Sequence, residues 1–106
     1  MASESVEQEY LLLQQQLRNI LIQKEALKLQ IAEIDAALYE LSRCEEENVY
    51  KLVGYVMIKK RKEEVEKELN EVKEDSQIRI NSLESVEKDL VEKIKRVEEK
   101  LKSKVS

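Results

Sequence analysis

Hydrophobic residues recur every three and four positions along two long stretches of this chain. In the first stretch the repeat holds for five heptads, with Lys24 as its single polar member. A regular 3.5-residue repeat indicates a coiled-coil seam, because the apolar stripe of an ordinary core helix is wider and less regular. We therefore predict a helix over residues 5–43, with Ser5 as its N-cap and Gln8 completing a capping box. The seam residues are Val6, Tyr10, Leu13, Leu17, Ile20, Lys24, Leu27, Ile31, Ile34, Leu38 and Leu41.

The second stretch repeats this pattern and predicts a helix over residues 63–104. One extra spacing of four, between Ser76 and Ile80, is a stutter, which locally unwinds a coiled coil without breaking it. The similar lengths of the two helices favour an antiparallel pair with both chain termini together at one end. The seam residues are Val65, Leu69, Val72, Ser76, Ile80, Leu83, Glu87, Leu90, Ile94, Val97 and Leu101.

Between the helices, residues 49–59 are rich in β-branched and aromatic residues around Gly54, the only glycine of the chain. This composition predicts a β-hairpin. Gly54 supplies the positive φ that the first central residue of a type II′ turn requires. The predicted register therefore places Val53 opposite Val56 and Leu52 opposite Met57.

Composition excludes several classes of function. The chain has no His, no Gly-rich phosphate loop and no second element that could close a pocket around paired carboxylates, so we expect neither an enzyme nor a cofactor. Cys44 is the only cysteine, which argues against a disulfide framework and against a thiolate metal site. Acidic residues outnumber basic ones, 23 to 19, which disfavours nucleic acid as a partner.

The chain is also expected to be cytoplasmic. No apolar run approaches the roughly 20 residues that span a bilayer, so no membrane contact is predicted. The N-terminus lacks the basic-then-apolar order of a signal peptide, and a lone thiol suits a reducing compartment.

The predicted hairpin is the element that most needs a partner. An isolated two-stranded hairpin is marginal in water, and its open edges invite pairing with another chain. The apolar stripes of both helices are already committed to each other, so the helices cannot cover it. The chain is therefore expected to assemble with other subunits through this hairpin.

The sequence resembles a β-type prefoldin subunit of the archaeal kind. The resemblance spans residues 1–106, read as one prefoldin-like domain. The residues that carry it are Ala37–Leu41, Asn48–Gly54, Val56–Lys59 and Glu63–Leu69. Within them, a Val-Tyr-Lys-x-x-Gly core lies between two matched coiled-coil helices. A single hairpin, rather than two, is similar to the β-type subunit and not to the α-type.

The resemblance implies a mostly α fold, an antiparallel two-helix coiled coil whose central hairpin joins those of other subunits in a β-barrel platform. It implies an ATP-independent chaperone subunit in an α2β4 heterohexamer with α-type subunits and other copies of the chain. Such a complex holds unfolded client proteins at the coiled-coil ends and passes them to a group II chaperonin. Subunit assembly would then fall on Val49, Tyr50, Leu52, Val53, Gly54, Val56, Met57 and Ile58. Client binding would fall on Val6, Tyr10, Leu11, Leu12, Leu13, Val97, Leu101 and Val105.

Several of these residues have a plainer interpretation. Leu11 and Leu12 lie off the seam, and they either contact clients or widen the helix packing, as the off-seam Leu21, Ile22 and Leu29 also could. Val97 and Leu101 are seam positions, for which helix packing is the simpler explanation. Lys24 is favoured as a register device that snorkels out of the seam.

Alternatives remain for the basic run after the hairpin and for the function of the whole chain. The basic run Lys59–Lys62 could bind nucleic acid or an acidic chaperonin tail, but the favoured interpretation is that it discourages strand stacking. The chain could also be a coiled-coil adaptor or tether that oligomerises through its hairpin without any chaperone role. A helical RNA-binding module is a weaker option, because both helices are acidic.

Overall fold

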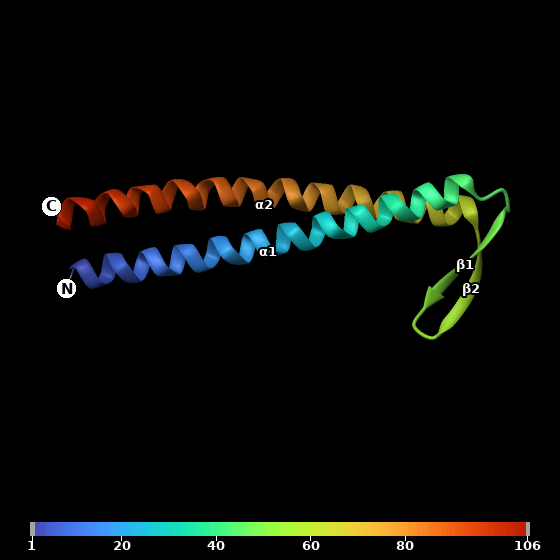
Figure 1. Cartoon of the computed structure of the whole chain (residues 1–106), viewed down its shortest axis with the longest axis horizontal. Coiled ribbons are helices and arrows are strands. Elements are labelled where there is room, and N and C mark those ends of the chain that lie inside the picture. Colours follow the sequence, from blue (N-terminus) through green and yellow to red (C-terminus); the bar gives the residue numbers. More distant parts are fainter. Residues whose placement is uncertain (1, 106) are drawn as a thin grey trace. The chain divides into compact units, whose positions relative to one another are not determined.

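The structure is a computed structural model that describes the backbone of residues 2–105 and the side chains of residues 5–103. Its elements follow one another as helix α1 (Ala2–Arg43), strand β1 (Asn48–Val53), strand β2 (Val56–Arg61) and helix α2 (Lys62–Val105) (Figure 1). These residues form two compact units. We call them the terminal unit, Met1–Ala26 with Arg79–Ser106, and the hairpin unit, Leu27–Ile78.

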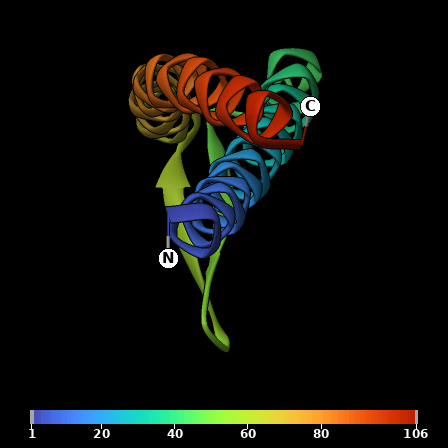
Figure 2. The ribbon, with the colours of Figure 1, turned by 90° about the vertical axis from the view of Figure 1, so that its left-hand side faces the viewer.

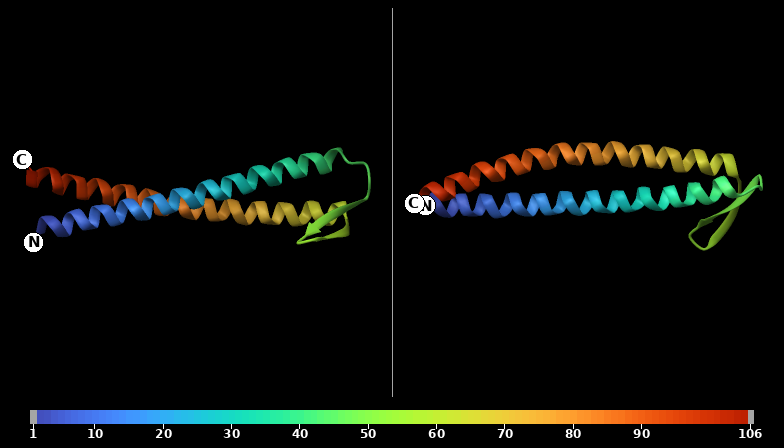
Figure 3. Two further views of the ribbon diagram at one scale, coloured as in Figure 1. Left: turned by 60° about the horizontal axis from the view of Figure 1, so that its bottom comes forward. Right: turned by 45° about the horizontal axis from the view of Figure 1, so that its top comes forward.

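In the terminal unit the two helical segments run antiparallel, side by side in both views of Figure 3. Its core is built from seam residues. Leu13, Leu90, Ile94 and Val97 are buried together. Val6, Tyr10, Leu17, Ile20 and Leu101 pack against them. Burying each such aliphatic side chain contributes about 1.5–3 kcal/mol, so the seam is the main source of stability in this unit.

In the hairpin unit α1 and α2 also pack through seam positions. Ile34 is buried, and Ser76 is 5% exposed with its hydroxyl donating to the side-chain oxygen of Gln30 at 3.4 Å. The two strands form an antiparallel sheet of their own. In Figure 2 the hairpin extends away from the helical segments of its unit.

The boundaries differ from the predicted ones at several places. Helix α1 begins at Ala2, so Ser5 lies inside the first turns of the helix and is not its N-cap, which corrects the capping-box prediction. The strands extend beyond residues 49–59, because the ladder continues to the pair Asn48 and Arg61. The basic run Lys59–Lys62 therefore lies mostly within β2, and only Lys62 belongs to α2.

Candidate assembly and client surfaces

The turn of the hairpin has the predicted geometry. Gly54 has a φ of 62°, whereas no other described residue has a positive φ, so Tyr55 does not. Positive φ at the first central residue alone fits a type II′ turn and excludes type I′. The register is also the predicted one, with Val53 opposite Val56 and Leu52 opposite Met57.

The hairpin exposes nearly all of its apolar side chains. One face carries Tyr50, Leu52 and Met57, which are 64–68% exposed. The side chains of Val53, Val56 and Ile58 on the other face are also exposed, and Val49 alone among the predicted assembly residues is half-buried. Tyr55 in the turn is fully exposed. So much apolar surface on one small element is typical of a protein interface.

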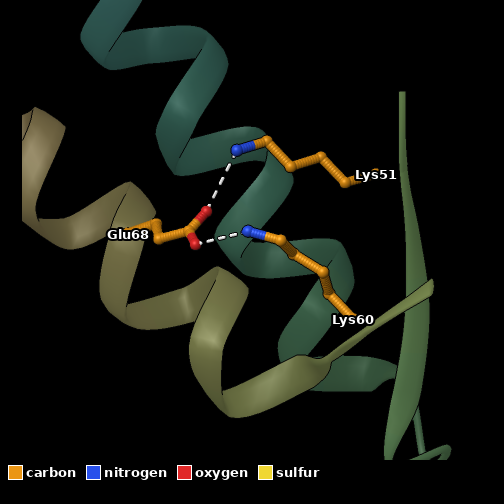
Figure 4. Close-up of polar contacts among 3 residues, drawn as sticks. All are labelled: Lys51, Lys60 and Glu68. Atoms are coloured by element: carbon orange, nitrogen blue, oxygen red, sulfur yellow. Dashed lines mark hydrogen bonds and ion pairs between the residues drawn. The ribbon is translucent and has the colours of Figure 1, made fainter. Parts of the chain in front are cut away.

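One carboxylate of α2 joins both strands of the hairpin to the helix. Lys51 of β1 and Lys60 of β2 donate to the two oxygens of Glu68, at 3.0 and 2.7 Å (Figure 4). Hydrogen bonds from Lys60 and then Lys51 hold the pKa of Glu68 below its usual range. We call these three residues the lysine fork. The fork was not predicted from the sequence. In the predicted register, however, the side chains of Lys51 and Lys60 lie on the same face of the hairpin.

The base of the hairpin is closed by Lys62, the first residue of α2. Its backbone N–H donates to the carbonyl of Glu47 at 2.8 Å, which extends the strand ladder by one step. Its ammonium group donates to the carbonyl of Cys44, also at 2.8 Å. These two bonds tie the entry and exit of the hairpin together. Cys44 is half-buried and free.

The predicted client residues fall into two groups. Leu13 and Val97 are buried in the terminal core, and Val6, Tyr10 and Leu101 pack against it, as their seam positions suggest. Leu11 and Leu12 are 64% and 55% exposed. The side chain of Val105 lies outside the described residues. Of the described client candidates, the structure therefore leaves Leu11 and Leu12 as the ones that offer an apolar surface.

Two polar contacts cross the terminal unit. Tyr10 donates to the carboxylate of Glu98 at 3.3 Å, and partial burial followed by that negative charge raises the pKa of the Tyr10 hydroxyl. Lys24 donates to Glu87 at 2.6 Å, which raises the pKa of Lys24. The Lys24 side chain is only 12% exposed, so it is paired inside the seam and does not snorkel to the surface.

The described residues contain no cluster of His, Cys, Asp and Glu side chains placed to bind a metal ion. Neither α1 nor α2 has a stretch that is apolar enough to cross a membrane.

Comparison with known proteins decides the family. A sequence profile described as "Prefoldin subunit" matches residues 5–106. The chain belongs to the prefoldin family. The prefoldin subunit beta of Archaeoglobus fulgidus is 38% identical over 95 residues, covering 89% of this chain and 82% of the relative. That of Thermococcus onnurineus is 38% identical over 91 residues, covering 85% and 78%.

The fold agrees with that of a solved prefoldin. The crystal structure of the prefoldin beta subunit from Thermococcus strain KS-1 matches with a TM-score of 0.86 at 32% sequence identity. The match covers 96% of this chain and 90% of that chain. The predicted fold, two long helices joined by one antiparallel hairpin, is therefore confirmed, as is the resemblance to the β-type subunit. The chaperone role and assembly with other prefoldin subunits follow from the family.

Proposed function

We propose that the chain holds unfolded proteins without ATP, as a β-type subunit of an α2β4 prefoldin hexamer, and delivers them to a group II chaperonin. The proposal places this activity in the cytoplasm, where the lone Cys44 would stay reduced. The observation that carries it is the concentration of exposed apolar side chains on the hairpin, together with the exposed pair Leu11 and Leu12 in the terminal unit. Single exposed apolar side chains, such as Leu29, Ile78 and Val86, also lie along the two helices.

These two surfaces suit different partners. Apolar side chains on a strand pair next to open edges suit another hairpin, because the edges add backbone hydrogen bonds to the apolar contact. Leu11 and Leu12 lie on a helix, whose backbone groups are already bonded, so they offer apolar contact alone. Contact of that kind is weak and independent of sequence, which is what a holder of many unfolded clients requires.

An aggregation assay tests the holding function. A guanidinium-denatured model enzyme is diluted into buffer with this chain alone, or with this chain and an α-type subunit, and light scattering is followed. We expect at least one of the two mixtures to suppress scattering. Suppression by neither would contradict the holding function and favour the adaptor. Transfer is then measured as client that moves to an added group II chaperonin.

Paired variants test the client surface. Changing both Leu11→Ser and Leu12→Ser should reduce suppression severalfold, because exposed apolar area is lost while the seam is untouched. The matched control changes Leu21→Ser and Ile22→Ser, an adjacent off-seam pair in the same helix that is 41% and 60% exposed. A smaller loss in the control supports the terminal leucines. Equal losses would spread the client surface along α1, and no loss in either would rule out Leu11 and Leu12.

A further inference from the structure

The exposed face of α1 that begins at Leu11 and Leu12 is almost free of charge. From residue 11 to residue 23 ten side chains are exposed, and Arg18 is the only charged one among them. The other nine are leucine, isoleucine, glutamine or asparagine. Because charged residues make up 40% of the sequence, so neutral a stretch does not follow from composition alone.

Helix α2 of the same terminal unit shows the contrast. From residue 88 to residue 100 every exposed side chain is charged. Pairs such as Asp89 with Lys93, and Glu92 with Arg96, have the four-residue spacing that stabilises an exposed helix. Charges of this kind would keep α1 soluble and helical equally well. The amide side chains of α1 therefore require a different explanation.

The nearest amides lie one helical turn beyond the two leucines. Gln15 lies four residues after Leu11. Gln16 lies four residues after Leu12, and Asn19 continues the row one turn later. Residues at this spacing are neighbours on one face of a helix. All three amides are exposed, and none forms a side-chain hydrogen bond within the described part of the chain. We call Gln15, Gln16 and Asn19 the amide stripe.

A side-chain amide complements the peptide group of another chain. It carries N–H donors and a carbonyl acceptor, whereas a carboxylate offers only acceptors and an ammonium group only donors. The peptide groups of an unfolded protein lack the internal partners that folding would give them. The backbone of α1 is already hydrogen-bonded within the helix, so side chains are the only groups through which this face can bond to a client backbone.

The neutrality of the stripe also affects which clients it accepts. A charged site would attract segments of opposite charge and repel those of like charge. Neutral amides do not distinguish acidic from basic segments. Water competes for an exposed hydrogen bond, so its net contribution is small. A client side chain that covers Leu11 and Leu12 would exclude water from the amides one turn away and so strengthen their bonds.

We propose that the amide stripe forms the second half of the client site and binds the unpaired peptide groups of an extended, unfolded segment whose apolar side chains lie on Leu11 and Leu12. This inference rests on the proposed holding function and names what the site recognises. The distance from Leu11 to Asn19 is about 12 Å at 1.5 Å per residue, which about four residues of extended chain cover. A folded protein, whose peptide groups are already paired, satisfies only the leucines.

Two peptides separate recognition of the backbone from recognition of side chains. One is a short, uncharged, fluorescent peptide of alternating leucine and threonine, and the other is the same peptide with its leucines N-methylated, which keeps every side chain but lacks those N–H donors. The chain assembled with an α-type subunit should bind the unmethylated peptide about fivefold more tightly, measured by fluorescence anisotropy. Changing Gln15→Ala, Gln16→Ala and Asn19→Ala should abolish this preference, while alanine preserves the helix.

Ser82→Ala with Ser85→Ala is the matched control, because it removes uncharged polar groups from exposed positions of α2 in the same unit. This control should keep the preference. The proposal is overturned if the wild type binds the methylated peptide as tightly, or if the stripe variant keeps the preference. It is also overturned if neither peptide binds. In that case intact suppression of enzyme aggregation would leave the holding function standing, and absent suppression would remove it as well.

A charged variant tests the neutrality of the site. Gln15→Glu with Asn19→Asp preserves the shape of the side chains but adds two negative charges. It should bind a lysine-containing peptide severalfold more tightly than a glutamate-containing one at low salt, and added salt should reduce the difference. The wild type, and a control with Ser82→Glu and Ser85→Glu, should bind the two peptides with similar affinity. A wild type that already distinguishes them as strongly as the charged variant would contradict the proposal.

Discussion

At the scale of single residues, Glu68 is the contact that joins the hairpin to helix α2. Its two oxygens bind Lys51 and Lys60 from different strands. We predict that Glu68→Gln loosens the hairpin, because a neutral amide cannot bind both ammonium groups as acceptors. Hydrogen exchange of the hairpin amides should then quicken. Glu64→Gln, an exposed position in the same helix, is the matched control. Equal exchange in both variants would mean that the fork does not restrain the hairpin.

The stabilisation that Glu68 provides should depend on pH. The folded pKa of Glu68 is lowered, chiefly by the hydrogen bond from Lys60. The stabilisation by the fork is therefore fully present above the unfolded pKa of about 4.3, and it is lost as the pH falls through the lower folded value. Carboxyl NMR of Glu68 should show this low midpoint, and Lys60→Met should raise it. A midpoint unaffected by Lys60→Met would contradict the geometry of the fork.

Contacts between individual side chains were the feature least predictable from the sequence. Lys24 and Glu87 were both recognised as seam positions, and they lie at nearly equal sequence distances from the turn at Gly54. Reflecting the chain about Gly54 places Lys24 opposite Glu84, about one helical turn from Glu87, so the neighbourhood of the pair could have been predicted but not its partner. The fork offered no such rule, because its formation depends on how far the hairpin bends toward α2, and no periodicity encodes that bend.

At the scale of elements, Gly54 controls the hairpin. A Cβ added there would meet no atom within 4 Å, so the difficulty with another residue is the φ of 62° and not space. We predict that Gly54→Ala destabilises the hairpin by about 1–2 kcal/mol, the usual cost of left-handed φ for an L-residue. The measurement is the dissociation constant of subunit assembly, while helix content should remain unchanged.

A mirror-image substitution provides the control. D-Alanine at residue 54, introduced by peptide ligation, favours positive φ and should strengthen assembly relative to L-alanine. If both alanines weaken assembly equally, the cost arises from something other than backbone conformation, and the role assigned to Gly54 is wrong.

The helices were the most predictable elements, because their seams repeat the same signal many times. Of the described residues of α1 up to Leu41, those that are not exposed are the predicted seam and Ala37. In α2 the seam positions are also shielded, except Val72, which is 41% exposed near the stutter. The neighbouring Lys73 forms an ion pair with Asp35 at 2.7 Å, and its side chain is 42% exposed. The ends of the two strands and the start of α1 were less predictable, because only one or two residues in the sequence indicate each boundary.

At the scale of the whole molecule, the chain cannot cover its own apolar surface. Charged residues make up 40% of the sequence, and the seams use most of the large aliphatic residues of the helices. Those of the hairpin are left in water. Sequence patterns could predict that the hairpin needs a partner, because both seams are already used to pack α1 against α2 and neither has surface left to cover the hairpin.

The uncovered apolar surface of the hairpin predicts that assembly depends on a few hairpin side chains. Leu52 and Met57 face each other and are 68% and 65% exposed. Replacing both by Ser should therefore change the stability of the single chain little but weaken the affinity of subunit assembly strongly. We expect a monomer by sedimentation, with unchanged helix content and a melting temperature that no longer rises with protein concentration. The control with Leu21→Ser and Ile22→Ser should assemble normally.

The monomeric variant also separates assembly from holding. If clients are held by several chains at once, each chain contributes weak contacts, and binding strength comes from their number. The Leu52→Ser and Met57→Ser variant should then need at least about tenfold more chains to suppress aggregation, although its Leu11 and Leu12 are intact. Suppression per chain equal to that of the wild type would mean that one terminal unit suffices. The hairpin would then serve only to gather subunits, and holding would be a property of the single chain.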